Sequence, residues 1–496
     1  MTELNATSQP GAPIAIGSRL ELLVDDYLIE QMRGGAALHL HQPVLREVVM
    51  RTDEPWEGNA SLYSSIFQDG ARFRMYYGSQ QYDVGEGVMT YPHPGFLCYA
   101  ESADGIHWRK PALNRVEFNG STQNNILRLV SDRGDPALID DTHVAVFKDT
   151  NPHCQPEVRY KALARGKNPL GLYAFGSANG IHFTRLRGQP ILTQGYFDSL
   201  NLAFWDGSRG EYRAYLRDFD GGVPDGVRGI LTATSQDFIH WTEPTWLRYP
   251  DAPIEQLYTN QIQPYARAPH IFIGFPMRYV DRGWTAQTDF LPELEPRRRR
   301  AAVSPRYGSA VTDGLFMSSR DGLTFKRWGE AFIRPGLRPQ DNWVYGDNCV
   351  AWGLVETRSE LAGAPNELSL YATESYWRGR DMHVRRYSLR LDGFVSVQAP
   401  LSGGEFVSKP VLFAGAKLVM NFSTSAAGSI RVELQDAVGE PLAGFTLADC
   451  PEIFGDSLEQ IVHWRGGSGL GSLAGKPIRL RFVLKDADLY SIRFGT

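Results

Sequence analysis

The stretch Ser102-Ala103-Asp104-Gly105-Ile106-His107-Trp108 decides the fold, because close copies of it recur along the chain. Related stretches occupy residues 177–183 (SANGIHF), 235–241 (SQDFIHW) and 319–325 (SRDGLTF), and a weaker copy occupies 391–394 (LDGF). An Asp-Gly or Asn-Gly pair before a β-branched or aromatic run is a strong hairpin signal. The copies are spaced irregularly, but each interval is long enough for a four-stranded sheet, which is the blade of a propeller.

Two further strand-like runs precede each copy and complete the blade pattern. The second runs are rich in aromatic residues and span 72–77, 158–163, 211–217, 270–275 and 367–373. The first runs span 61–68, 143–148, 200–205, 261–265 and 348–355. Five repeats of this pattern predict an all-β protein with a five-bladed β-propeller over residues 20–395. We expect the early strand 22–29 to help close the ring.

The pattern changes near residue 396. Alternating apolar and polar segments at 417–422, 429–434 and 478–484 lack the hairpin marker and predict a C-terminal β-sandwich over residues 396–496. Residues 1–19 are expected to form an N-terminal tail. The stretch 281–310 is a long insertion in the fourth blade, of the kind that serves as a lid or as a contact between copies in a homo-oligomer.

Composition excludes several classes of protein. The 496 residues carry a formal charge of −5, and Arg297–Arg300 form the one basic run, so no nucleic-acid partner is expected. There is no apolar stretch long enough to span a membrane and no secretory signal, which favours a cytoplasmic location. Four widely separated cysteines favour neither zinc nor disulfides. No cofactor is expected, although a central structural cation near His143 stays open.

Chemistry is expected on one face of the propeller. The start of each innermost strand and the end of each second strand open onto the same face, so residues distant in sequence converge there. We find acids at these points in most blades, and Arg165 and other basic residues among them. The acids at the starts of inner strands include the pair Asp140 and Asp141 in the second blade.

Paired carboxyl groups are what glycoside cleavage requires, because one must donate a proton and the other must attack the anomeric carbon or activate water. The catalytic candidates are Asp198, Glu374, Asp141, Glu57 and Asp347. Asp198 is the strongest, since residues 196–199 (YFDS) lead directly into an inner strand. The candidates for binding a carbohydrate through rings, guanidinium groups or amides are Trp56, His143, Asn201, Arg217, Asp218, Tyr258, Asn260, Arg278 and Tyr345. No metal ligands are assigned.

The five repeats, the aromatic second strands and the C-terminal segment resemble the five-bladed propeller glycoside hydrolases of families 32, 43 and 68. The resemblance implies a glycoside hydrolase that removes a terminal sugar, a furanoside or an unusual glycoside, from an oligosaccharide. The motifs diverge. Glu57 lies in Pro55-Trp56-Glu57 where an Asn-Asp-Pro-Asn-Gly motif would stand, and Arg133-Gly134-Asp135-Pro136 has one residue more than an Arg-Asp-Pro motif.

Two alternatives stay open. The chain could be an inverting glycoside phosphorylase resembling family 130, in which Arg217 and Arg278 hold phosphate, because the arginine fork matches phosphate oxygens. It could also be a propeller that binds carbohydrate without chemistry, since a fold does not fix a function.

Overall fold

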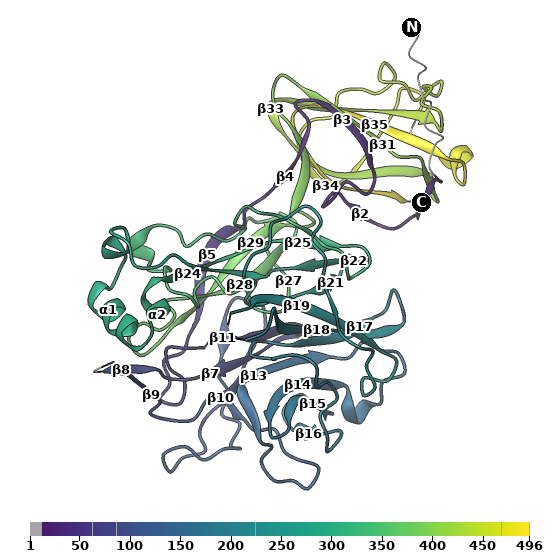
Figure 1. Ribbon diagram of the computed structural model, residues 1–496. Coiled ribbons are helices and arrows are strands. Elements are labelled where there is room, and N and C mark those ends of the chain that lie inside the picture. Colours follow the sequence, from purple (N-terminus) through teal and green to yellow (C-terminus); the bar gives the residue numbers. More distant parts are fainter. Residues whose placement is uncertain (1–11, 62, 86, 224, 468, 496) are drawn as a thin grey trace. The chain divides into compact units, whose positions relative to one another are not determined.

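The computed structural model describes residues 12–495 apart from 62, 86, 224 and 468. These residues form two compact units (Figure 1). The propeller unit comprises Pro43–Tyr265 and Pro269–Ser388. The terminal unit comprises the described part of residues 1–42 together with 266–268 and the described part of 389–496.

The propeller unit consists of five blades, each an antiparallel sheet whose first strand is the innermost. Blade 1 contains β6 (Ser64–Asp69), β7 (Arg72–Ser79), β10 (Phe96–Ser102) and β11 (Trp108–Arg109), with β12 (Ile126–Leu127) also paired to β10. Blade 2 contains β13 (Ile139–Lys148), β14 (Tyr160–Lys167), β15 (Leu170–Ser177) and β16 (Thr184–Arg185). Blade 3 contains β17 (Leu202–Asp206), β18 (Glu211–Asp220), β19 (Val227–Ser235) and β20 (Thr245–Trp246).

Blade 4 contains β21 (Gln263–Tyr265), β22 (Ala268–Gly274), β25 (Met317–Ser319) and β26 (Lys326–Arg327). Blade 5 contains β27 (Val355–Thr357), β28 (Glu367–Glu374), β29 (His383–Arg390) and β5 (Val44–Arg51). The five-bladed propeller predicted from the repeated hairpin marker is therefore confirmed, and the predicted first and second strands overlap the observed ones in every blade.

The strand that closes the ring differs from the prediction. β5 pairs antiparallel with β29, with Met50 opposite Val384, so the fourth strand of blade 5 comes from the N-terminal side of the chain. Residues 22–29 do not close the ring, because the strands that contain Leu22 and Ile29 pair within the terminal unit. The weak fifth copy of the marker thus follows β29 without forming a blade hairpin.

The marker explains how neighbouring blades are joined. In its first copy Asp104 Oδ1 accepts hydrogen bonds from the backbone N–H groups of Ile106 and His107, each at 2.8 Å, which forms a tight Asx turn. A tyrosine on the second strand of the neighbouring blade then donates to the carbonyl oxygen of the marker glycine. The pairs are Tyr371 to Gly105 at 2.6 Å, Tyr76 to Gly180 at 2.9 Å and Tyr215 to Gly322 at 3.0 Å.

The inner strands of blades 1 and 5 meet directly, which keeps the ring closed at its centre. The backbone N–H of Ile66 donates to the carbonyl of Trp352 at 2.7 Å, and the Trp352 N–H donates to Ser64 at 2.8 Å. Residue 353 has to be glycine, because a Cβ there would lie 1.7 Å from the carbonyl oxygen of Ile66. The side chains between the blades form a large apolar core and a smaller one between blades 1 and 2.

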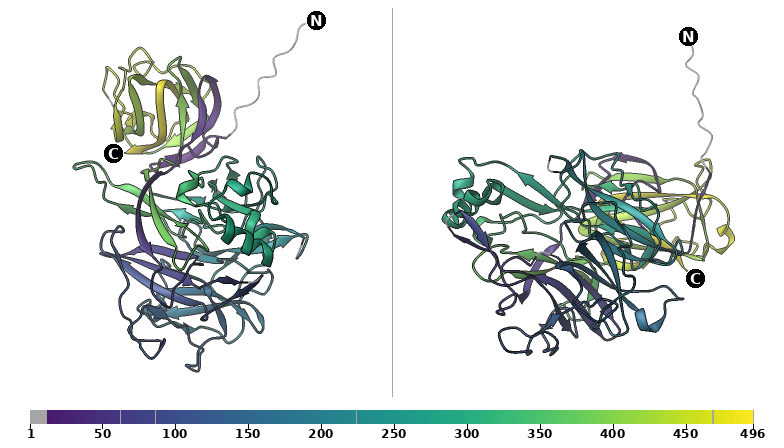
Figure 2. Two further views of the ribbon diagram at one scale, coloured as in Figure 1. Left: turned by 90° about the vertical axis from the view of Figure 1, so that its left-hand side faces the viewer. Right: turned by 60° about the horizontal axis from the view of Figure 1, so that its bottom comes forward.

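The predicted insertion in blade 4 is confirmed and carries the helices of the propeller unit. It contains β23 (Met277–Asp281), α1 (Leu294–Val303), α2 (Arg306–Ser309) and β24 (Ala310–Gly314), and β23 pairs with β24. The two helices lie side by side, apart from the four-stranded sheets (Figure 2). α1 also lies against the hairpin of β8 (Asp83–Gly85) and β9 (Val88–Thr90) from blade 1 (Figure 1).

The terminal unit is one hydrogen-bonded network of ten strands. Its C-terminal strands are β30 (Val395–Ala399), β31 (Gly404–Ser408), β32 (Val411–Phe413), β33 (Lys417–Asp436), β34 (Asp456–Ile461) and β35 (Ile478–Gly495). Its N-terminal strands are β1 (Ile14–Gly17), β2 (Glu21–Leu22), β3 (Ile29–Gly34) and β4 (Ala37–Leu40). A separate apolar core fills this unit. The division of these strands into the two sheets of a sandwich stays a prediction.

Two predicted boundaries were wrong. Residues 20–42 belong to the terminal unit and not to the propeller, since β3 pairs with β31 and β4 pairs with β30. Residues 14–17 are not part of a tail, because β1 pairs in parallel with β32. Residues 1–11 lie outside the described residues. Among the helices that the structure describes, none has the length and apolarity needed to cross a membrane.

Candidate functional site

The start of β13 is bulged toward blade 1. Ile139 pairs with Gly166 and Val144 pairs with Ala164, so residues 140–143 stand opposite a single residue of β14. The bulge rests on Gly78 of β7, where a Cβ would come within 2.5 Å of the Thr142 carbonyl oxygen. Bulges of this kind re-aim side chains next to functional sites.

Two carboxyl groups from neighbouring blades share two basic side chains. His143 Nδ1 lies 3.1 Å from Asp140 Oδ1, and His143 Nε2 lies 3.8 Å from Asp198 Oδ1. Arg165 Nη1, on β14, lies 3.2 Å from Asp198 Oδ1 and 3.9 Å from Asp140 Oδ2. We call Asp140, His143, Arg165 and Asp198 the carboxylate cluster. The Tyr63 ring of blade 1 packs on His143 with centroids 4.9 Å apart.

The adjacent acids of the bulge differ in protonation. Burial favours the neutral form of Asp140, but hydrogen bonds from His143 and Thr142 and the imidazole charge outweigh it and hold the pKa of Asp140 below its ordinary value. Among the described residues, no hydrogen-bond donor contacts the Asp141 carboxyl group. Burial raises the pKa of Asp141 to about 7. The charge of Arg128 opposes this rise, and the charge of Asp140 adds to it. Asp140 is therefore ionised at neutral pH, while Asp141 is partly protonated.

Asp198 is held by a strained and well-tied loop. Phe197 has a φ of 59°, a left-handed conformation that is rare for an aromatic residue and marks stored strain. Asn201 Nδ2 donates to the carbonyl of Phe197 at 3.0 Å, and Arg217 Nη1 donates to that of Asp198 at 3.2 Å. The Asp198 side chain itself is 42% exposed, which leaves it open to a ligand.

A group of aromatic rings lies beside the carboxylate cluster. Arg217 lies 5.0 Å from the Tyr258 ring centroid, and the Asp198 charge adds to burial in raising the pKa of the Tyr258 hydroxyl. The charge of Asp140 likewise reaches Tyr82. The rings are linked in series by centroid distances of 5.0–6.2 Å: Tyr258, Tyr279, Tyr345, Tyr307, Trp377 and Tyr82. We call these six the aromatic face.

Two buried arginines of α1 fix the insertion that supplies part of this face. Arg297 is fully buried and donates to the carbonyl oxygens of Gly308 at 2.8 Å and Trp343 at 2.9 Å. Arg300 donates to the carbonyl of Trp377 at 3.1 Å. Burial lowers the pKa of Arg297 to about 10, so it stays charged at neutral pH. The basic run 297–300 thus ties the insertion to blade 5.

Three of the predicted catalytic acids have their contacts within their own blades. Fully buried Glu57 accepts hydrogen bonds from Lys110 Nζ at 2.6 Å and from the Tyr77 hydroxyl. Asp347, also fully buried, accepts from the backbone N–H groups of Tyr376 and Val344 at 2.7 and 2.9 Å. Glu374 accepts from Arg385 at 2.7 Å and Tyr387 at 3.1 Å. Asp141, the fourth, lies at the bulge beside Asp140. We leave the three out of the site.

Several predicted binding residues likewise bond within the fold. Trp56 Nε1 donates to Asn125 at 2.7 Å, and Asn260 Oδ1 accepts from the backbone of Ile262 at 3.3 Å. Asp218 accepts from the Phe219 N–H at 2.9 Å. Arg278 is held by Asp313 at 2.7 and 2.9 Å and by Glu255 at 3.1 Å. Of the predicted residues, Asp198, His143, Arg217, Tyr258, Tyr345 and Asn201 meet around the carboxylate cluster and the aromatic face.

Sequence reasoning missed part of the aromatic face. Tyr279 and Tyr307 belong to the insertion. Because the insertion lacks the blade pattern, its sequence does not predict where these rings lie relative to the propeller. Tyr82 and Trp377 follow second strands by a few residues, beyond the strand ends at which candidates were sought. A search extended three residues past each second strand would have found both. Within the described ranges, no group of three or more His, Cys, Asp or Glu side chains is arranged to hold a metal ion.

Comparison with known proteins gives short or loose matches. No family model matches the chain. An uncharacterized protein of Mycobacterium tuberculosis, found in two strains, is 38% identical over 74 residues, which are 14% of this chain and 24% of that protein. The chain therefore spans about a quarter of the length of the curated relatives that it matches.

Solved structures of carbohydrate-active proteins are similar at low identity. A Bombyx mori GH32 β-fructofuranosidase is 10% identical, with 92% of this chain and 94% of that one covered and a TM-score of 0.40. An N-acetylgalactosamine deacetylase from F. plautii is 11% identical, with coverages of 72% and 96% and a TM-score of 0.42. A structure from the GH130 family of mannoside phosphorylases is 15% identical, with coverages of 71% and 94% and a TM-score of 0.36. The five blades are established by this chain's own strand pairing.

Proposed function

We propose that the protein is a glycoside hydrolase that removes a terminal sugar from an oligosaccharide or glycoside at the carboxylate cluster. One observation carries the proposal: Asp140 and Asp198, from adjacent blades, share His143 and Arg165 next to the aromatic face. Glycoside cleavage takes two carboxyl groups that differ in protonation, with rings against which the apolar face of a sugar can stack.

Asp140 supplies the ionised carboxylate in this mechanism. Its pKa is held below the ordinary value by His143 and Thr142, so it keeps its charge as positive charge develops at the anomeric carbon. Whether it attacks the carbon or activates a water molecule depends on the distance between the two carboxyl groups, which is shorter in retaining than in inverting enzymes, and the product anomer reports the outcome.

In this mechanism Asp198 donates the proton to the leaving oxygen, and His143 orients its carboxyl group. His143 Nδ1 faces Asp140, which leaves Nε2 directed to Asp198 Oδ1 at 3.8 Å. An imidazole between two carboxylates can pass a proton from one nitrogen to its acid partner while it is oriented by the other. The exposure of Asp198 supports its contact with substrate.

Two observations support the hydrolase over the alternatives. The phosphorylase reading depends on Arg217 and Arg278. Arg217 is buried and donates to backbone carbonyls, and Arg278 is neutralised by Asp313 and Glu255. A propeller that only binds carbohydrate has no need of an ionised Asp140 that shares a histidine with a second, exposed acid.

A glycoside panel tests the proposal. The wild-type protein is incubated with aryl furanosides, aryl pyranosides and plant and microbial oligosaccharides, in phosphate-free buffer, and released sugar is identified by chromatography. The Asp198→Asn variant is the negative control, and Asp132→Asn, which alters a surface ion pair with Arg185 in blade 2, is the matched control. We expect release by the wild type and Asp132→Asn only. Equal release by Asp198→Asn would contradict the proposal.

A further inference from the structure

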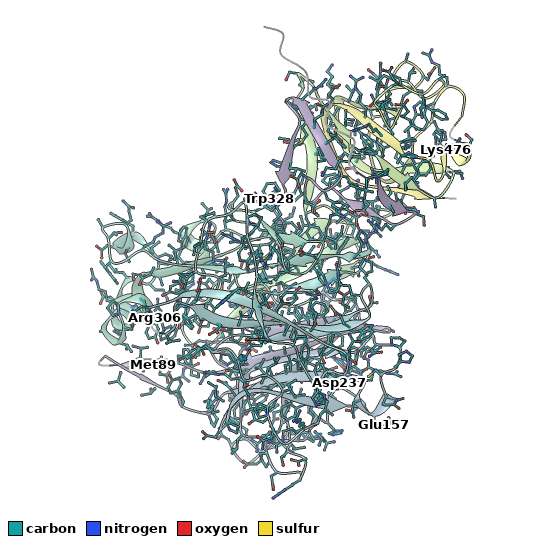
Figure 3. All side chains as sticks on the ribbon, turned by 45° about the vertical axis from the view of Figure 1, so that its right-hand side comes forward. Met89, Glu157, Asp237, Arg306, Trp328 and Lys476 are labelled. Carbon is teal, nitrogen blue, oxygen red and sulfur yellow. The ribbon has the colours of Figure 1, made fainter. Side chains whose placement is uncertain are left out.

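Two arginines converge on one ring of the aromatic face. The Arg228 guanidinium, from β19, lies 4.7 Å from the Tyr279 ring centroid and 5.8 Å from that of Tyr258. Arg306, from α2, opposes the rise that burial causes in the pKa of the Tyr279 hydroxyl, and it lies 5.6 Å from the Tyr345 ring centroid. Arg306 is labelled in Figure 3, on the same side of the propeller unit as Met89 of β9. Both arginines are half-buried.

Among the residues that the structure describes, neither arginine has an acidic partner within ion-pair distance. Arg228 Nη1 donates to the amide oxygen of Gln256 at 2.9 Å, and Arg306 Nη2 donates to the Tyr307 hydroxyl at 3.4 Å. The contrast is with Arg278, one residue from Tyr279, which forms ion pairs with Asp313 and Glu255. Half-buried guanidinium groups are normally paired, because desolvation of an unpaired charge is costly.

Arginines are concentrated in this region of a protein whose formal charge is −5. Around the carboxylate cluster and the aromatic face stand Arg165, Arg217, Arg228 and Arg306. Arg165 is shared by the two acids of the cluster. Burial lowers the pKa of Arg217, and repulsion from the nearby Arg228 acts in the same direction. The nearby Asp281 accepts its hydrogen bonds from Ser309 and Gly283.

We infer that the ligand of this face carries an oxyanion, which Arg228 and Arg306 bind next to Tyr279. The inference rests on the proposed function, since it names the class of sugar that the same site takes. An arginine matches the two oxygens of a carboxylate, sulfate or phosphate with parallel hydrogen bonds, and a planar ring beneath it keeps the fork in place. The preferred substrate is therefore an acidic glycoside, with its charged group directed toward blades 3 and 4.

The same chemistry has two sources, an acidic sugar and free phosphate, and binding measurements separate them. Isothermal titration calorimetry with the Asp198→Asn variant, which cannot turn over ligand, compares the affinity for glucuronate with that for glucose, and for galacturonate with that for galactose. Inorganic phosphate is titrated alone. We expect the acidic sugar of at least one pair to bind tenfold or more tightly than its neutral partner. Phosphate binding at comparable affinity, with phosphate accelerating cleavage by the wild type, would assign the oxyanion to a co-substrate.

Variants test the two residues. Arg306→Gln and Arg228→Gln in the Asp198→Asn background are each expected to abolish the preference for the acidic partner while neutral-sugar affinity changes less than twofold. Arg299→Gln, an exposed arginine of α1, is the matched control and keeps the preference. Circular dichroism and melting temperature confirm that each variant is folded. Equal affinity for acidic and neutral sugars, with no phosphate binding, overturns the inference.

The inference and the proposed function fail in distinguishable ways. Selective binding of an acidic sugar without release of any sugar by the wild type would keep the oxyanion site and reject the hydrolase. Release of neutral sugars, with acidic ones bound no more tightly, would keep the hydrolase and reject the oxyanion site.

Discussion

The inner-strand starts of blades 2 and 3 can be compared with those of blades 1 and 5, because acids stand at the same topological position in all four. Asp140 and Asp198 share His143 and Arg165, and Asp198 is 42% exposed. Glu57 and Asp347 are fully buried. Glu57 accepts a hydrogen bond from Lys110, and Asp347 accepts one from the backbone N–H of Tyr376. The same position therefore holds acids of two kinds. Shared cations and exposure distinguish the acids suited to chemistry from those that hold the blade together.

Replacement of the ionised acid gives the largest expected effect. Asp140→Asn should lower kcat/KM by about three orders of magnitude, because the variant cannot stabilise charge at the anomeric carbon. Activity on the glycoside identified by the panel is the measurement, and Asp132→Asn is the control. A variant within tenfold of the wild type would remove Asp140 from the mechanism.

The same substitution has a second readout in stability. The pKa of Asp140 is depressed in the folded state, so its contribution is present above the ordinary value of 3.8 and is lost as pH falls below it. Asp140→Asn should melt below the wild type at pH 7, and the difference in melting temperature should begin to narrow as pH falls below 3.8. A gap that widens on acidification would contradict the assigned direction.

A blade 5 acid should behave in the opposite way. Glu374→Gln removes the carboxylate charge to which Arg385 and Tyr387 donate hydrogen bonds. We therefore expect the free energy of unfolding to fall by about 2 kcal/mol. Turnover should stay within a factor of about two of the wild type. Chemical denaturation and the released-sugar assay measure the two effects. Loss of turnover with unchanged stability would place blade 5 in the active site and break the comparison.

The sequence predicts the blades well and the site in part. The marker at 102–108 and its copies locate four hairpins, because Asp-Gly geometry is local and each copy satisfies its own backbone. The ring is closed by β5, which pairs with the distant strand β29. A local sequence pattern does not contain this long-range pairing. Asp198 could be found from its place before β17. Glu374 pairs with Arg385 and so is not part of the site. This pairing depends on which face of β28 packs inward, and packing between the blades decides that.

The α1 arginines provide a smaller test on the aromatic face. Arg297 holds Gly308 and Trp343 together through two carbonyls, and a lysine has one compact ammonium that cannot span both. Arg297→Lys should raise KM on the order of tenfold while kcat stays near wild type, because uniform binding is lost. Arg298→Lys, whose residue is exposed on the same helix, is the control. An equal fall in kcat would contradict a positioning role.

The smallest effect concerns Asp141. Its pKa is raised to about 7, so ionisation opposes folding and stability is lost as pH rises from the ordinary value of 3.8 toward 7. Asp141→Asn removes this cost, and its melting temperature should exceed that of the wild type at pH 8 by roughly 2–4 °C and match it at pH 3. A variant less stable than the wild type at pH 8 would show that the carboxylate has a stabilising partner.

The position of a bound sugar tests the central claim most directly. A crystal structure of Asp198→Asn with the oligosaccharide identified by the panel should place a sugar ring against Tyr258 or Tyr345, with the glycosidic oxygen in hydrogen-bond reach of residue 198. The structure also contains a cavity of about 660 Å³ beside the insertion, lined by residues that include Arg278, Asp313 and Trp343. A sugar bound in that cavity, with the carboxylate cluster unoccupied, would contradict the account.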